Sequence, residues 1–255
     1  LNAGVAGNNS SAILNESQIF DSVIDTTNTL QMFVNGELST DFGSYILADQ
    51  DRIVLVYSDN PVVSFNTTFG PLVLELFDDE APNTVDNFLN YANRGDFVNS
   101  FFHRSVTDFV IQGGGFATTS TDFVSTAQFS RIDTDPPVEN EPGRSNLRGT
   151  IAMAKTSDPD SATNQFFVNL SDSNTFLDEP SNSGGFTVFG QILDIDVADE
   201  INDLPIDTSN PSPYGELPVG ADGTLVVVQE LVGQGEITGS KFIDLDLDGS
   251  FDSDD

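Results

Sequence analysis

The chain has 255 residues, enough for one large domain or for a medium domain with a small companion. Asp and Glu number 41 against 8 Lys and Arg, and the resulting formal net charge of −33 repels nucleic-acid phosphates. The composition therefore excludes a nucleic-acid-binding protein. No apolar run reaches the ~18 residues of a membrane-spanning helix, and the lack of cysteine excludes disulfides and a thiol nucleophile.

The polar part of the composition bears on where the protein works. Acidic residues, Ser, Thr and Asn are abundant and cysteine is absent. This combination fits an extracellular protein, in salty or calcium-rich water. We therefore expect a secreted, extracellular or cell-surface location, with the periplasm as a further option.

Two short regions precede the main part of the chain. Residues 1–28 have only isolated apolar positions, which predicts a polar arm that cannot bury a core alone. Residues 29–60 contain two strand-like runs, Leu30–Val34 and then Tyr45–Leu47 leading into Arg52–Tyr57. Asn35-Gly36 follows the first run and favours a hairpin turn. We expect a small β unit here.

Residues 61–234 alternate dense strands with two helices. A helix is predicted from Pro82 to Gly95, because apolar residues recur at i, i+3, i+4 and i+7 between a helix-starting proline and a helix-ending glycine. Asp196 is predicted to cap a second helix that Pro205 ends. Strands are predicted at Leu72–Phe77, Gly149–Ala154, Phe166–Asn169, Thr187–Leu193 and Thr224–Val232. Such a pattern predicts a mainly β fold, a closed antiparallel barrel with a helix at each end.

The segment that carries the chemistry is FFHRSVTDFVIQGGGF, residues 101–116. Its three glycines suggest a phosphate-binding loop, but no helix follows and no Lys or Ser/Thr has P-loop spacing. The segment resembles the signature of cyclophilins, the peptidyl-prolyl cis-trans isomerases. RGTIAMAK (148–155), SATNQFFVN (161–169), FLD (176–178) and FTVFG (186–190) resemble the bacterial branch of that family, in the right order.

The resemblance implies a fold and an activity. The fold is an eight-stranded barrel capped by two helices, spanning residues 61–234. The activity is isomerisation of X–Pro bonds in proline-containing polypeptides, whose barrier of ~18–20 kcal/mol comes from amide resonance. No proton is transferred, so catalysis needs an apolar pocket for the proline ring and a fixed cation on the twisted amide. No cofactor is needed for catalysis.

The resemblance also assigns residues. Arg104 is implied to be the cation on the twisted amide. Gln112 is implied to be the polar group that fixes the orientation of the substrate and of Arg104. The residues implied to contact substrate are His103, Phe109, Val110, Ala154, Lys155, Gln165, Phe167, Phe176, Leu177 and Phe186. Each phenylalanine could instead be ordinary core, and Lys155 and Gln165 could lie on the surface without contact. The single histidine suggests a general base, but we interpret it as pocket wall or structural donor.

Several positions depart from the family pattern. The turn over residues 105–108 lacks the Pro-Gly of many relatives, Val110 replaces a longer Met, and Lys155 replaces the usual Asn of eukaryotic members. Phe176 stands where cyclosporin-sensitive members have Trp, and Phe186 replaces a His. We therefore expect activity with weak cyclosporin binding.

A second signal lies at the C-terminus. Residues 235–255 are predicted to be a linker that ends in the acidic run DLDLDGSFDSDD. This run has acids at positions 1, 3, 5, 9 and 12 and Gly at position 6, which is the spacing of an EF-hand calcium loop. The implied Ca²⁺ ligands are Asp244, Asp246, Asp248, Ser250, Asp252 and Asp255. Asp at position 12 resembles a dockerin loop; a solvated acidic tail is the alternative.

A function of another class also fits the sequence. An isomerase needs no polar arm, extra β unit or calcium loop, yet all three are present. The alternative is therefore a structural subunit of a surface or extracellular polymer, joined through its N-terminal strands and calcium.

Overall fold

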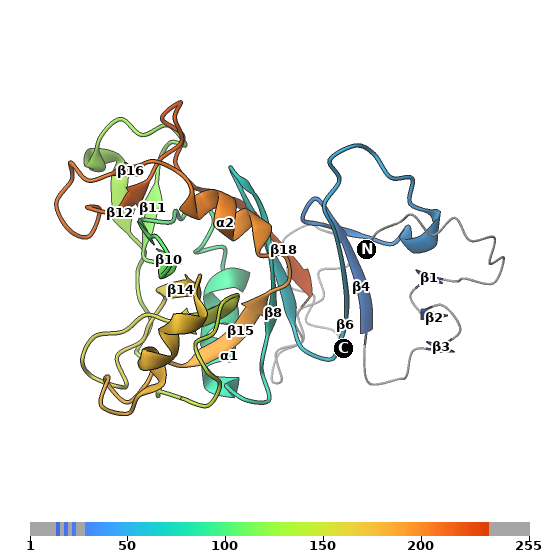
Figure 1. Cartoon of the computed structure of the whole chain (residues 1–255), viewed down its shortest axis with the longest axis horizontal. Coiled ribbons are helices and arrows are strands. Elements are labelled where there is room, and N and C mark those ends of the chain that lie inside the picture. Colours follow the sequence, from blue (N-terminus) through green and yellow to red (C-terminus); the bar gives the residue numbers. More distant parts are fainter. Residues whose placement is uncertain (1–13, 16–17, 20–21, 24–28, 235–255) are drawn as a thin grey trace.

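The structure is a computed structural model that describes residues 14–15, 18–19, 22–23 and 29–234. It is mainly β, as predicted, and its largest element is an eight-stranded antiparallel sheet (Figure 1). In sheet order the strands are β18 (Val228–Gln234), β7 (Val62–Thr67), β8 (Gly70–Leu76), β15 (Val188–Ile192), β13 (Thr150–Met153), β14 (Phe166–Asn169), β10 (Val110–Gly113) and β9 (Arg104–Val106).

The two ends of this sheet come together without forming a continuous ladder. β9 and β18 are the outer strands. The segments that precede them are joined by one antiparallel bridge between Phe101 and Val227, next to a 3.0 Å hydrogen bond from the Phe102 amide to the Val226 carbonyl. The eight strands are confirmed, whereas full closure goes beyond the pairing in the described residues.

Both predicted helices are present. α1 (Pro82–Asn93) has proline in its first turn and is followed by Gly95 in the left-handed region, φ 75°. α2 (Asp196–Asn202) begins one residue earlier than predicted, so the prediction of Asp196 as its cap is wrong. Instead a carboxylate oxygen of Asp194 accepts a 3.2 Å hydrogen bond from the Asp196 amide.

A group of phenylalanines lies in the core between α1 and the sheet. Phe65, Phe88, Phe97 and Phe166 are at most 1% exposed, and their ring centroids lie 5.2–5.8 Å apart. Stacked and edge-on aromatic pairs at such distances add to the stabilisation from apolar burial. This packing makes the sheet rigid, and strands of the same sheet carry residues of the site.

The N-terminal unit is a three-stranded sheet in the order β5 (Glu37–Ser39), β4 (Thr29–Val34) and β6 (Ile53–Ser58). Asn35 and Gly36 form the predicted hairpin turn with φ of 53° and 88°. The predicted strand at Tyr45–Leu47 is wrong. These residues follow the 3-10 helix η1 (Phe42–Ser44) and pair with no strand of the described chain, leaving Ile46 87% exposed.

This unit packs against the outside of the large sheet. Phe33 and Val56 join Val62 and Val73 in one buried cluster, and Arg52 lies 2.5 Å from Glu200. Figure 1 shows the three strands beside β8 and β18, on the side away from β10 and β14. Small additional elements are β1 (Leu14–Asn15), β2 (Gln18–Ile19), β3 (Ser22–Val23), β11 (Phe116–Thr118), β12 (Phe129–Arg131), β16 (Ile206–Asp207), β17 (Leu217–Pro218), η2 (Thr126–Gln128) and η3 (Asp172–Asp178).

Candidate active site

Arg104 begins β9 and lies opposite Gln112 of β10 in the strand register. Its guanidinium carbon is 5.7 Å from the centre of the Phe109 ring, and its Nε donates a 2.6 Å hydrogen bond to Glu216. The terminal nitrogens of Arg104 have no hydrogen-bond partner among the described residues. The side chain is 31% exposed, so a fixed cation with free donors faces the solvent side of the sheet.

A cavity of about 180 Å³ lies beside Arg104, and we call it the proline pocket. Its walls are Arg104, Phe109, Val110, Gln112, Ala154, Lys155, Phe167, Leu177 and Phe186. All nine are among the residues that the sequence singled out. Val110, Phe167 and Leu177 are at most 5% exposed and belong to one apolar cluster. The structure therefore assembles an apolar pocket for one small side chain, with a cation at its rim.

The polar residues of the site are held in place by contacts with each other. Gln112 donates a 3.1 Å hydrogen bond to Gln165. The Lys155 ammonium donates to the Ser183 carbonyl and lies 4.7 Å from the centre of the Phe186 ring. Burial lowers the pKa of Lys155, with nearby Asp160 and Asp158 acting in the opposite direction. Lys155 and Gln165 thus lie at the site rather than on a distant surface.

Three of the predicted contact residues lie outside the proline pocket. Gln165 lines a second cavity and reaches the pocket only through its hydrogen bond with Gln112. Phe176 stacks on Phe109 at 5.8 Å between centroids and is 51% exposed, so it extends the rim. His103 is 2% exposed and faces the same second cavity as Gln165.

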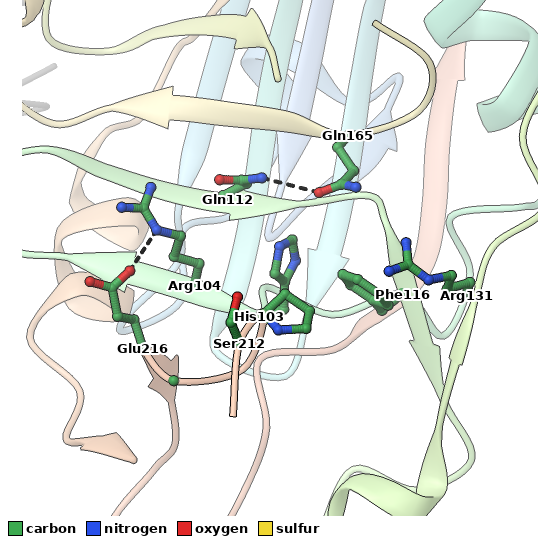
Figure 2. A pocket seen from close by; sticks show the side chains of 10 residues that line it. His103, Arg104, Gln112, Phe116, Arg131, Gln165, Ser212 and Glu216 are labelled. Atoms are coloured by element: carbon green, nitrogen blue, oxygen red, sulfur yellow. Dashed lines mark hydrogen bonds and ion pairs between the residues drawn. The ribbon is translucent and has the colours of Figure 1, made fainter. Parts of the chain in front are cut away.

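The second cavity, which we call the flanking cavity, has a volume of about 370 Å³. It is lined by His103, Arg104, Gln112, Phe116, Arg131, Gln165, Ser212, Pro213, Gly215 and Glu216. Figure 2 shows Arg104 and Glu216 at one end, Phe116 and Arg131 at the other, and His103 between them. Arg104, Gln112 and the proline pocket are therefore directly next to this larger space.

His103 is neutral at physiological pH. Burial, together with the smaller effects of the charges of Arg104 and Arg131, lowers its pKa to about 3. The ring meets Phe116 edge-on at 4.8 Å, and Nδ1 has no hydrogen-bond partner. A histidine with this pKa is a poor general base at neutral pH, in keeping with a reaction that moves no proton.

A buried amide network supports the proline pocket from behind. The amide of Asn169 donates to Asn146 at 3.0 Å, and Asn174 donates to Asn169 at 2.7 Å and to the Phe109 carbonyl at 2.9 Å. Asp178 accepts hydrogen bonds from the Ser145 hydroxyl and from the Asn146 side chain, the latter at 2.8 Å. Burial raises the pKa of Asp178, but its hydrogen bonds with Ser145 and Asn146 lower it by more. Asn146 and Asn174 were not singled out from the sequence, because asparagines more often lie in exposed turns.

The three glycines have a steric role. A Cβ on Gly114 would lie 2.4 Å from the Asn164 carbonyl oxygen, and one on Gly115 would lie 2.6 Å from the Gln165 side chain. The end of β10 can therefore approach the residues that precede β14. This contact, rather than phosphate binding, explains the glycine run.

The predicted calcium ligands lie outside the described residues. Within the described ranges there is no group of three or more His, Cys, Asp or Glu side chains that could hold a metal ion. The part of the chain with assigned structure also has no helix long and apolar enough to cross a membrane.

The comparison with known families decides the identity of the domain. Residues 62–218 match the model described as "Cyclophilin type peptidyl-prolyl cis-trans isomerase/CLD". The chain belongs to the cyclophilin family. It is a peptidyl-prolyl cis-trans isomerase by membership, as the resemblance of the motifs predicted.

Individual relatives agree with this assignment. Over 159 residues the cyclophilin domain is 43% identical to peptidyl-prolyl cis-trans isomerase A of Dickeya dadantii, covering 61% of this chain and 77% of that protein. Over 145 residues it is 41% identical to peptidyl-prolyl cis-trans isomerase B of Escherichia coli, covering 55% of this chain and 83% of that protein. A crystal structure of a Cryptosporidium parvum cyclophilin shares the fold, with TM-score 0.50 and 21% identity over 69% of this chain and 98% of that one.

Proposed function

We propose that this cyclophilin accelerates X–Pro rotation by seating the proline ring in the proline pocket while Arg104 stabilises the twisted amide. Twisting breaks amide resonance and returns a lone pair to the prolyl nitrogen. A hydrogen-bond donor then interacts more strongly with the twisted state than with the planar one, which lowers the barrier. Arginine suits this role because its charge is permanent and its donors are held in a plane.

The observation that carries this proposal is the position of Arg104. Its Nε binds Glu216, while its terminal nitrogens, which pair with no other described residue, lie at the rim of an apolar pocket. Because the donors of Arg104 already lie at the pocket rim, they need little reorganisation when the amide twists. Gln112 lines the same pocket and is itself held by Gln165, so it can position the peptide backbone.

The test is cis-to-trans isomerisation of a short Ala-Pro peptide by the intact chain and by Arg104→Ala. We expect turnover to fall by about 10²–10³-fold, the usual cost of removing one preorganised donor. Arg104→Lys should also be strongly impaired, because a point charge cannot replace the planar fork. Arg94→Ala removes the same charge from the end of α1 and is the control. Unchanged turnover in folded Arg104→Ala would exclude this mechanism.

We propose that the substrates are extracellular or periplasmic proteins. The net charge of −33 and the absence of cysteine support a location outside the cytoplasm. Detection of the native protein in culture medium, cell-surface or periplasmic fractions would test this. Detection in the cytoplasm alone would contradict it.

For the C-terminal loop we propose calcium binding through Asp244, Asp246, Asp248, Ser250, Asp252 and Asp255. The spacing of hard oxygen ligands around Gly249 supports the proposal. Calorimetric titration with Ca²⁺ should show one site that Asp244→Asn with Asp248→Asn removes. Equal weak binding by both proteins would indicate a solvated acidic tail.

A second candidate function is assembly of a surface or extracellular polymer through the N-terminal unit. β5 and β6 are the outer strands of their sheet, and each pairs only with β4 in the described chain. Ile46 and Leu47 beside this sheet are 87% and 58% exposed. Such edges can pair with another chain. Light scattering at high protein concentration in millimolar calcium tests this, and a strict monomer would contradict it.

A further inference from the structure

The flanking cavity has about twice the volume of the proline pocket, and a proline ring does not account for it. Arg104 and Gln112 line both cavities. Because each extended residue advances the chain by about 3.3–3.6 Å, residues near the proline of a bound peptide can reach this space. The flanking cavity therefore meets the side chain of a neighbouring residue of the substrate.

Arg131, one of the two arginines that line this cavity, differs from the other arginines of the described chain in its charge environment. Five arginines form ion pairs with Asp or Glu: Arg52, Arg94, Arg104, Arg144 and Arg148. Arg131 has no carboxylate partner among the described residues, although the chain carries 41 acids against 8 bases. Its guanidinium instead lies 5.1 Å from the centre of the Phe116 ring. Arg131 is exposed, and its planar donors lie beside the Phe116 ring, where they are available to an anion.

The rest of the polar lining is consistent with an anionic ligand. His103, a residue only 2% exposed, lines this cavity between Arg104 and Arg131 (Figure 2). The carboxylate of Glu216 is already bound by Arg104. The lining thus holds two cations and one neutralised acid, in a protein whose surface is otherwise strongly negative.

We propose that the flanking cavity is a specificity subsite that binds the carboxylate of an Asp or Glu close to the proline of the substrate, with Arg131 as its anchor. The proposal rests on the proposed placement of proline in the proline pocket. A guanidinium binds a carboxylate through two parallel hydrogen bonds, which neutral side chains cannot match.

The test uses peptides built around Ala-Pro, with both ends blocked so that no terminal carboxylate competes. Each peptide carries one Glu at a different position within four residues of the proline, and its partner peptide carries Gln there. The readout is the ratio of kcat/KM for the Glu and Gln peptides. We expect a ratio of about two- to fivefold at one position, as for an accessible ion pair.

Variants then assign the effect to the cavity. Arg131→Gln should bring the ratio to one, and Arg131→Glu should reverse the preference so that a Lys peptide is favoured at that position. Arg94→Gln removes an equal charge at the end of α1 and should leave the ratio unchanged.

The outcomes separate this inference from the proposed function. A Glu/Gln ratio of one at every position overturns the subsite. The same ratio at all positions, lowered also by Arg94→Gln, overturns it too, because the overall electrostatic field of the protein would then explain the preference. Absence of turnover on the Gln peptides is a failure of the proposed isomerase mechanism itself. In that case binding of the Glu and Gln peptides, followed by NMR shifts of Arg131 and His103, decides the subsite separately.

Discussion

Glu216 binds Arg104 through its side chain and the next residue, Ser105, through its main chain. The carboxylate accepts a 2.6 Å hydrogen bond from Nε of Arg104, and the Glu216 carbonyl accepts a 2.8 Å hydrogen bond from the Ser105 amide. Glu216 is thereby fixed beside β9, in the wall of the flanking cavity. We therefore regard Glu216 as a positioning residue for Arg104, since its carboxylate holds one nitrogen and leaves the others free.

Replacement of Glu216 should lower turnover through Arg104. We expect Glu216→Ala to reduce kcat about three- to tenfold with a smaller change in KM, because the guanidinium loses a fixed orientation worth ~1 kcal/mol. Glu216→Gln keeps an oxygen that can accept from Nε and should recover most of the loss. Steady-state kinetics on an Ala-Pro peptide distinguish the two. Higher turnover in Glu216→Ala would mean that the carboxylate restrains the cation instead of orienting it.

The single histidine should make stability depend on pH. The pKa of His103 is about 3 in the folded protein and about 6.5 when exposed in the unfolded chain. Between these values the unfolded state binds the extra proton, so stability falls as pH decreases through the window. From pH 6.5 to 4.5 this contribution should amount to about 2 kcal/mol of lost unfolding free energy.

Denaturant unfolding at pH 6.5 and pH 4.5 measures this loss. His103→Gln should show a difference between the two pH values that is smaller by about the same 2 kcal/mol, whatever its absolute stability. The carboxylates titrate equally in both proteins and cancel from the comparison. Identical pH differences in the two proteins would show that His103 is not buried in its neutral form.

The proline pocket was predictable because its residues lie within short ordered blocks. Arg104, Gln112 and Phe167, for example, are each embedded in a motif that fixes their strand and face. The hairpin at Asn35-Gly36 was predictable for another reason, since a two-residue turn with positive φ is a local property of those residue types.

Other features depend on contacts between distant residues. Glu216 is 112 positions from Arg104, and nothing in its own segment indicates the pairing. Arg131 is notable only because no acidic side chain of the described residues pairs with it, which a sequence does not show. Tyr45–Leu47 has the apolar pattern of a strand, yet a strand needs a partner and none lies beside it in the described residues. Such outcomes are decided by tertiary structure.

Phe176 should control cyclosporin binding. Its ring stacks on Phe109 and is 51% exposed, at the position where cyclosporin-sensitive relatives have Trp. We expect weak inhibition of the natural chain and about tenfold tighter inhibition of Phe176→Trp, because indole adds apolar area and an N–H donor at the rim. Inhibition constants from the Ala-Pro assay measure this, with Phe176→Leu as the variant that should gain nothing. Equal constants for Trp and Leu would exclude Phe176 as the determinant.

Gly36 should be essential for docking of the N-terminal unit on the barrel. It has φ 88°, and a Cβ there would lie 1.9 Å from Oδ1 of Asn66 and 2.6 Å from Cβ of Pro71, both on the large sheet. Gly36→Ala must therefore displace the hairpin as well as strain it, and we expect a loss of about 2–4 kcal/mol in unfolding free energy.

Gly223→Ala is the matched control, since its φ is 91° but nothing lies within 4 Å of the new Cβ, so it should lose only about 1 kcal/mol. Turnover of the Ala-Pro peptide should stay at the natural level in Gly36→Ala, because the unit packs beside β8 and β18, away from the proline pocket (Figure 1). Equal stability losses in the two variants would show that the hairpin does not rest on the barrel in solution.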